Sequence, residues 1–169
     1  MTSTTLNMSM MKNSPQLLSY DIAPGVRAFS TMRHGGVGEG AYSSFNINSY
    51  CGDSQENIAA NKAALAETLG IEPTKILLPH QVHGADFCII APDFMALPEE
   101  ERAKVIEGVD GIFTSMSGVC IGVSTADCIP IIIYDPEHHA ACAVHAGWRG
   151  TVKRIASKAV AEMQTTYHS

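Results

Sequence analysis

The sequence predicts an α+β fold, in which many short strands and a few helices share one core. Two observations support this prediction. Short apolar runs bounded by turn residues recur along the chain, whereas only two or three segments have helical periodicity. The chain has 169 residues, of which 46% are hydrophobic and 17% charged. These values are typical of a single globular domain with a sizeable core.

The N-terminal third is predicted to contain a leader, a strand, a loop and a helix. Residues 1–20 are polar and rich in Met and Ser and lack an apolar signal-peptide core, so we expect a loose leader. Val26–Ser30 is predicted as a strand that enters the glycine-rich loop 31–40. Asp53–Glu56 resembles a capping box, which predicts a helix that ends at Gly70.

The remaining sequence predicts six strands and two helices within a single domain over residues 21–169. Pro98–Glu107 is predicted as a short acidic helix with a solvated face, and Thr151–Met163 as an amphipathic helix. The predicted strands are Ile76–Leu78, Phe87–Ile90, Gly111–Thr114, Val119–Ser124, Ile129–Tyr134 and Ala140–His145.

Charge and cysteine usage exclude several classes of function. The formal net charge is -6 and Lys and Arg form no cluster, so we expect neither nucleic acid nor an anionic membrane as a partner. No apolar run approaches the roughly 20 residues that span a bilayer. The five cysteines are odd in number and lack Cys-x-x-Cys spacing, which favours reduced thiols in a cytoplasmic protein. We expect a small-molecule substrate as the partner.

Two predicted strands bring metal-binding or nucleophilic residues to their ends. Cys128 comes directly before one strand, and His145 ends the next and is followed by the Gly-Trp-Arg-Gly turn at 147–150. Alternation along the second strand directs Cys142 to one face and His145 to the other, so Cys142 is predicted to be a core thiol. Such strand ends beside glycine turns are where a rigid sheet presents a site to solvent.

A second polar cluster offers another imidazole. His80 and His83 are three residues apart and would diverge in an extended chain, so only one of them should enter the same site. We expect it to be His83, beside Gly84, and we expect His80 to be dispensable for metal binding.

One cysteine and two histidines match a catalytic zinc site whose fourth position is open to water or substrate. Copper accepts the same ligand types, so it remains an alternative. A Cys–His hydrolase pair of Cys128 and His145 is a third interpretation. Arg149, near a predicted helix start, and Arg33, in the glycine-rich loop, could together bind an anion such as phosphate. Cys51, Cys88 and Cys120 are interpreted as small core residues, and Trp148 as a packing residue under the turn.

Six segments in one order resemble the laccase-domain family. This family is also called the multicopper polyphenol oxidoreductase or purine nucleoside phosphorylase family, and it includes a bacterial peptidoglycan editing factor. The resemblance extends over about Val26 to Met163, and its last two motifs are highly specific. The segments are Thr31–Val37, Ser44–Asn46, Gln81–Gly84, Asp110–Thr114, Thr125–Pro130 and His145–Gly150.

The resemblance implies a layered α/β/β/α domain with mixed sheets, similar to the catalytic domain of a deamidating toxin. The family's metal ligands correspond to His83, Cys128 and His145, and its two arginines to Arg33 and Arg149. It implies a zinc enzyme for phosphorolysis of adenosine, inosine or methylthioadenosine and for deamination of adenosine. A copper polyphenol oxidase ranks second, since the seven histidines are few for a multicopper site. A hydrolase that edits peptidoglycan precursors through Cys128 is a further alternative.

The chain departs from the family pattern in two places. Family members usually have Lys or Arg before Gln-Val-His, where this chain has His80, which offers an extra ligand or a group behind the ligands. Members usually continue through a Gly-Pro-rich segment, so we expect this chain, which stops at Ser169, to lack that segment of the pocket.

Overall fold

The computed structural model describes residues 14–169, which fall into two compact units. Among these residues, unit 1 contains those up to Asp21 and Arg27–Pro73, and unit 2 contains Ile22–Val26 and Thr74–Ser169. Residues 21–169, which were expected to form a single domain, extend over both units. No helix in this part of the chain is both long enough and apolar enough to cross a membrane.

Unit 1 combines a two-stranded sheet with one long helix. Strand β1 (Leu17–Tyr20) pairs antiparallel with β2 (Ala28–Thr31), and the one-turn helix η1 (Gly40–Tyr42) follows in the glycine-rich loop. The expected leader over residues 1–20 thus ends in a paired strand, whereas residues 1–13 lie outside the described part.

Helix α2 (Gln55–Leu69) confirms the helix predicted in unit 1. Ser54 is its N-cap, and the Ser54 hydroxyl accepts a hydrogen bond from the Asn57 N–H at 3.1 Å. Gly70 ends the helix in the left-handed region at φ 72°. A 3₁₀ turn, η2 (Pro73–Lys75), then leads into unit 2.

Unit 2 contains two sheets, and the larger one is mixed. Strands β3 (Ile76–Leu77) and β6 (Cys120–Ile121) pair in parallel. The four-stranded sheet has the order β4-β5-β8-β7, in which β4 and β5 are parallel and the other neighbours are antiparallel. Its strands are β4 (Phe87–Ile90), β5 (Gly111–Thr114), β8 (Ala140–Ala146) and β7 (Ile129–Asp135). The predicted α+β class with mixed sheets is confirmed.

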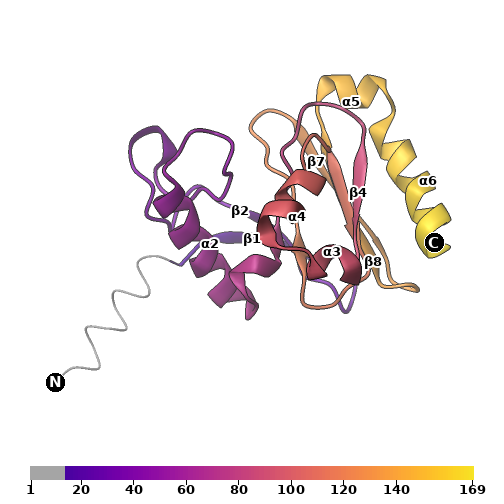
Figure 1. Ribbon diagram of the computed structural model, residues 1–169, viewed down its shortest axis with the longest axis horizontal. Coiled ribbons are helices and arrows are strands. Elements are labelled where there is room, and N and C mark those ends of the chain that lie inside the picture. Colours follow the sequence, from indigo (N-terminus) through magenta and orange to yellow (C-terminus); the bar gives the residue numbers. More distant parts are fainter. Residues whose placement is uncertain (1–13) are drawn as a thin grey trace. The chain divides into compact units, whose positions relative to one another are not determined.

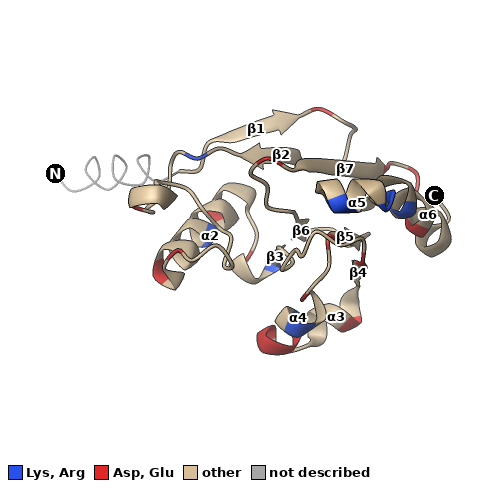
Figure 2. Cartoon of the chain, turned by 90° about the horizontal axis from the view of Figure 1, so that it is seen from above, with Lys and Arg blue, Asp and Glu red and all other residues tan. Residues whose placement is uncertain are grey.

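Helices cover the four-stranded sheet. Helix α6 (Ile155–Tyr167) packs against β8 (Figure 1), where Cys142 and Val144 join Ile155, Ala159 and Met163 in one core cluster. A second cluster joins Ile112 of β5 to α3 (Pro92–Ala96) and to residues around α4 (Glu99–Val105). The three glutamates that begin α4 are exposed, as expected of a solvated acidic helix, and Figure 2 colours this part of the helix red.

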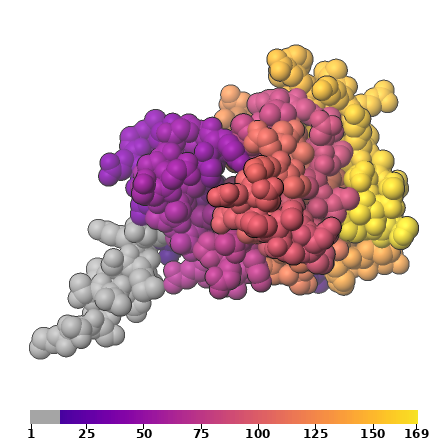
Figure 3. All heavy atoms as spheres, in the orientation of Figure 1, coloured from indigo at the N-terminus to yellow at the C-terminus, as the bar shows by residue number. Residues whose placement is uncertain are grey.

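The C-terminal helix predicted over Thr151–Met163 is wrong at its start. The chain instead forms α5 (Trp148–Val152) and then α6, separated by Arg154 in the left-handed region at φ 58°. Ile155, Ala159 and Met163 do form the buried face of α6, but Val160 is 45% exposed and Val152 is 76% exposed. The α5 segment protrudes at the surface in the space-filling view (Figure 3).

Candidate metal centre

Three side chains of unit 2 converge on one point. The ligand atoms of His83, Cys128 and His145 all lie within 4.8 Å of one another, and no other group of three or more potential ligands occurs in residues 14–169. The two imidazole rings meet edge to face, with centroids 4.7 Å apart and planes at 80°. His145 is buried, Cys128 is half-buried and His83 is exposed, so the group opens to solvent on the His83 side.

Strand pairing places two of the three candidate ligands. His145 is the penultimate residue of β8, and Cys128 directly precedes the first residue of β7. Ile129 pairs with Ala146 in the antiparallel register, which brings Cys128 to the end of β8 where Gly147 follows. The third ligand, His83, lies in the turn before β4 in the left-handed region at φ 61°. As expected, His83 joins the group and His80 does not. The two side chains diverge because the chain turns at His83, whereas the prediction assumed an extended chain.

Asp110 holds this turn and one of the ligands at once. Its side chain is fully buried, and its carboxyl oxygens accept hydrogen bonds from the backbone N–H groups of Val82, His83 and Gly84 at 3.2, 3.0 and 2.6 Å. One of the same oxygens lies 2.7 Å from Nδ1 of His145. When Nδ1 donates to this carboxyl group, the lone pair of Nε2 is available to bind a metal.

Gly147 leaves room where the three ligands meet. A Cβ added there would lie 2.8 Å from Cδ2 of His83, 3.3 Å from Sγ of Cys128 and 3.5 Å from Cε1 of His145. Real Cβ atoms essentially never approach another atom to under 3.0 Å, so any other residue would displace the His83 ring. The two nitrogen donors and one sulfur donor suit a tetrahedral zinc or a copper ion.

The remaining predicted residues lie elsewhere. Nδ1 of His80 lies 2.5 Å from Oε1 of Glu107, and His80 is not in the group of three candidate ligands. Arg33 belongs to unit 1, where its Nε and Nη2 donate to the Ser43 carbonyl at 3.2 and 2.8 Å. Arg149 is exposed on α5, and its guanidinium lies 5.3 Å from the ring centroid of Trp148.

Two of the interpretations made from sequence are wrong. Trp148 is 71% exposed rather than packed under the turn. Cys51 is exposed, and its thiol donates to the Asn48 carbonyl at 3.2 Å, so it is not a core residue. In contrast, Cys142 is buried on the opposite face from His145, and burial raises the pKa of its thiol.

No metal-ligand pattern in the sequence indicates a role for Asp110, or for Gly147 by itself. Asp110 directly precedes β5, in which all four residues are buried. An acidic residue at the start of a fully buried strand must find hydrogen-bond partners, and this signal could have identified it.

The chain matches a family described as multi-copper polyphenol oxidoreductase laccase over residues 27–169. It is 37% identical over 139 residues to a purine nucleoside phosphorylase of Bacteroides thetaiotaomicron, which covers 82% of this chain and 52% of that relative. It is 41% identical over 139 residues to adenosine deaminase RL5 of an unknown prokaryotic organism, which covers 82% of this chain and 53% of the relative. The chain thus spans about half the length of these relatives.

Two solved structures have a similar fold. The crystal structure of YlmD from Geobacillus stearothermophilus is 34% identical with a TM-score of 0.79, covering 87% of this chain and 56% of that one. The YfiH protein of Bacillus licheniformis has the same fold, with a TM-score of 0.81 at 24% identity over 91% of this chain and 57% of that one. The chain therefore belongs to the multi-copper polyphenol oxidoreductase laccase family.

Proposed function

We propose that this family member is a zinc-dependent enzyme of purine nucleosides, with the metal held by His83, Cys128 and His145. The convergence of these three side chains within 4.8 Å is the observation that supports the proposal most strongly. Two relatives more than 30% identical are named for phosphorolysis and deamination of purine nucleosides, which suggests the substrate class.

The three ligands fit a catalytic rather than a closed structural site. Three protein donors leave one of the four positions of tetrahedral zinc for water or substrate, and the exposed side of His83 offers the entry. A zinc ion in such a site supplies Lewis-acid chemistry and activates water at neutral pH. Asp110 fixes the tautomer and orientation of His145, and the missing side chain of Gly147 keeps the approach open.

Arg149 is the residue of unit 2 that we assign to phosphate. It lies two residues after Gly147, is exposed, and presents a guanidinium that can bind a phosphate through two hydrogen bonds. In phosphorolysis a phosphate oxygen replaces the base at C1′ of the ribose, so this arginine would hold the co-substrate. We assign Arg33 a supporting role in the same enzyme, although its guanidinium donates to the Ser43 carbonyl within unit 1.

A copper-dependent polyphenol oxidase is the second candidate, because the family's description names that activity. Four histidines other than His83 and His145 are not part of the ligand group found in the described residues, so they add no further ligands for copper there. His138 pairs with Asp135 on the β7–β8 turn, His139 contacts Tyr134, His80 pairs with Glu107, and His168 follows α6. A hydrolase that uses Cys128 as nucleophile and edits peptidoglycan precursors is the third candidate.

The test combines metal analysis with turnover assays. Protein purified without added metal is measured for zinc and copper, and then assayed with adenosine and inosine in the presence and absence of phosphate. We expect about one zinc per chain and release of free base that requires phosphate. Arg149→Lys should weaken this release by roughly tenfold or more, because lysine does not replace a bidentate contact.

Each outcome separates the candidates. Release of ammonia from adenosine without phosphate would favour deamination over phosphorolysis. Copper-dependent oxidation of phenols without nucleoside turnover would overturn the proposal in favour of the oxidase. Activity that survives complete removal of metal but is lost in Cys128→Ala would favour the cysteine hydrolase.

A further inference from the structure

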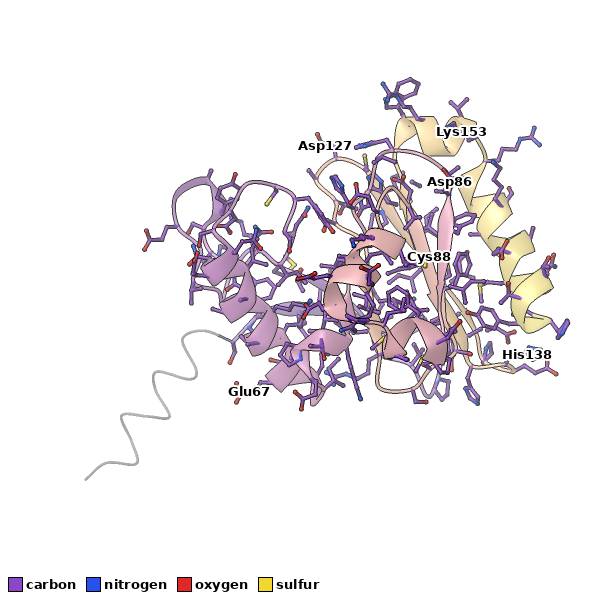
Figure 4. All side chains as sticks on the ribbon, in the orientation of Figure 1. Glu67, Asp86, Cys88, Asp127, His138 and Lys153 are labelled. Carbon is purple, nitrogen blue, oxygen red and sulfur yellow. The ribbon has the colours of Figure 1, made fainter. Side chains whose placement is uncertain are left out.

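Two of the three ligand residues lie on segments that are not regular secondary structure. His83 is in the turn between β3 and β4, and Cys128 ends the segment between β6 and β7. Thr125, Ala126 and Asp127, just before Cys128, are all exposed, and Asp127 is labelled near this end of unit 2 in Figure 4. A metal site needs its ligand atoms held within a fraction of an ångström, so something must fix these two segments to each other.

The side chain of Gln81 joins them. Its Nε2 donates to the Ser124 carbonyl at 2.8 Å, and its Oε1 accepts from the Ser124 N–H at 2.7 Å. The primary amide thus pairs with both backbone groups of one residue, as a neighbouring strand would, across 43 residues of sequence. Gln81 is two residues before His83, and Ser124 is four residues before Cys128.

The other hydrogen bonds of these two segments fix each of them to a different part of unit 2 and do not join them to each other. On the His83 side, Asp110 fixes the backbone of residues 82–84 from the core. On the Cys128 side, the Gly122 N–H donates to the Leu77 carbonyl at 3.1 Å, which continues the β3–β6 pairing. Between Gly122 and the start of β7, the amide of Gln81 therefore makes two hydrogen bonds that tie the cysteine segment to the histidine turn.

We propose that Gln81 is a positioning residue that sets the Cys128 segment against the His83 turn, so that thiol and imidazole meet before a metal binds. This inference rests on the metal centre proposed above. It predicts that Gln81 contributes to metal affinity without touching the metal, because in its absence the cysteine segment must be ordered at the expense of binding energy.

The test replaces Gln81 with Met, which preserves length and removes both hydrogen bonds. Gln164→Met is the matched control, since Gln164 is exposed on α6. Zinc affinity is measured by competition with a chelator, and cobalt(II) absorption reports thiolate coordination. We expect Gln81→Met to weaken zinc binding by about 10–100-fold, the usual effect of a group that orients metal ligands. Its cobalt–thiolate band should weaken, and the control should match the parent in both measurements.

A second measurement tests the tether without metal. Hydrogen exchange of metal-free protein should be faster over residues 122–128 in Gln81→Met than in the parent. Parental zinc affinity together with parental exchange in this segment would overturn the inference. If Gln81→Met does not fold, Gln81→Glu, which keeps the length and the acceptor for the Ser124 N–H, is judged by the same two criteria.

The two proposals fail in different ways. A parent protein that binds no zinc defeats the metal centre of the proposed function, and accelerated exchange in Gln81→Met would still identify the tether. Zinc binding by the parent with no effect of Gln81→Met on affinity or exchange defeats the tether alone.

Discussion

Each unit of this chain contains a loop held by one buried polar side chain, and the two side chains differ in kind. In unit 1, Asn61 is 1% exposed; its Oδ1 accepts from the Val37 N–H at 2.9 Å and its Nδ2 donates to the Asn46 carbonyl at 2.9 Å. In unit 2, Asp110 is 0% exposed and accepts from three consecutive N–H groups and from His145.

The difference explains why, in the described residues, the loop of unit 2 presents candidate metal ligands and the loop of unit 1 does not. An amide both donates and accepts, so Asn61 links backbone groups of opposite polarity and forms a self-contained loop, in which Arg33 donates to the Ser43 carbonyl. A carboxyl group only accepts, so Asp110 gathers the N–H groups of residues 82–84 and the ring of His145. The turn then directs His83 outward beside His145.

The largest expected effect tests whether the ligand-presenting loop binds a metal at all. Cys128→Ala removes one of three ligands and should abolish tight zinc binding, because two imidazoles alone seldom hold zinc. Cys142→Ala is the matched control, since its thiol faces α6 and burial raises its pKa. Isothermal titration with zinc measures both variants. Equal loss of zinc binding in the two would contradict the assignment of faces along β8.

The second prediction exchanges the kind of side chain that holds the turn. In Asp110→Asn, the NH₂ group of the new side chain must face a backbone N–H group or Nδ1 of His145. Two hydrogen-bond donors then meet without an acceptor. We expect a loss of about 3 kcal/mol in the free energy of unfolding and about 10–100-fold in zinc affinity. Denaturant unfolding of metal-free protein and zinc titration measure the two effects separately.

Asp127→Asn is the matched control for this substitution. Asp127 is exposed and adjacent to Cys128, so it shares the neighbourhood and the change of charge but not the buried contacts (Figure 4). If zinc affinity falls by the same factor in both variants, the loss comes from the change of charge near the site. The comparison of the two loops would then be wrong.

Local patterns predicted much of the fold. Phe87–Ile90 and Gly111–Thr114 match the observed strands residue for residue, since each is an apolar run bounded by polar or turn residues. The break between α5 and α6 was missed because Arg154, rather than glycine, adopts the left-handed conformation there. Its position depends on how α6 packs against β8, which the helical pattern alone does not contain.

The candidate site was predictable in its ligands but not in their support. Cys128 and His145 are at strand ends, where alternation and the family resemblance both indicate them. The roles of Asp110 and Gln81 depend on contacts across 26 to 43 residues, and no local pattern encodes those distances. Candidate ligands at strand ends can be recognised in the sequence, whereas the residues that orient them can be recognised only in the folded structure.

The third prediction applies the converse exchange in unit 1. Asn61→Asp keeps an acceptor for the Val37 N–H but places an acidic oxygen against the carbonyl groups of Ser44 and Asn46. We expect a loss of about 2 kcal/mol in the free energy of unfolding from the buried groups left unpaired. Zinc affinity should not change. Gln55→Glu, an exposed neutral-to-acidic change on α2, is the control in the same denaturation assay.

The smallest expected effect concerns the carboxyl group of the unit 1 loop, Asp53. A hydrogen bond from the Asn46 side chain is the main cause that lowers its pKa from the ordinary 3.8, with the Ser54 N–H and the Asn57 side chain assisting. A lowered pKa in the folded state means that Asp53 stabilises the fold above the unfolded pKa, and that this contribution is lost as the pH falls through the folded value.

The free energy of unfolding of Asp53→Asn should therefore lie below that of the parent by a constant amount at higher pH. This difference should shrink as the pH drops below about 4. Urea unfolding of both proteins across this range measures the difference. Parallel pH curves would show that Asp53 has no preferential interaction with the folded loop. Asp53 would then contribute only as a hydrogen-bond acceptor, which the amide oxygen of asparagine can replace.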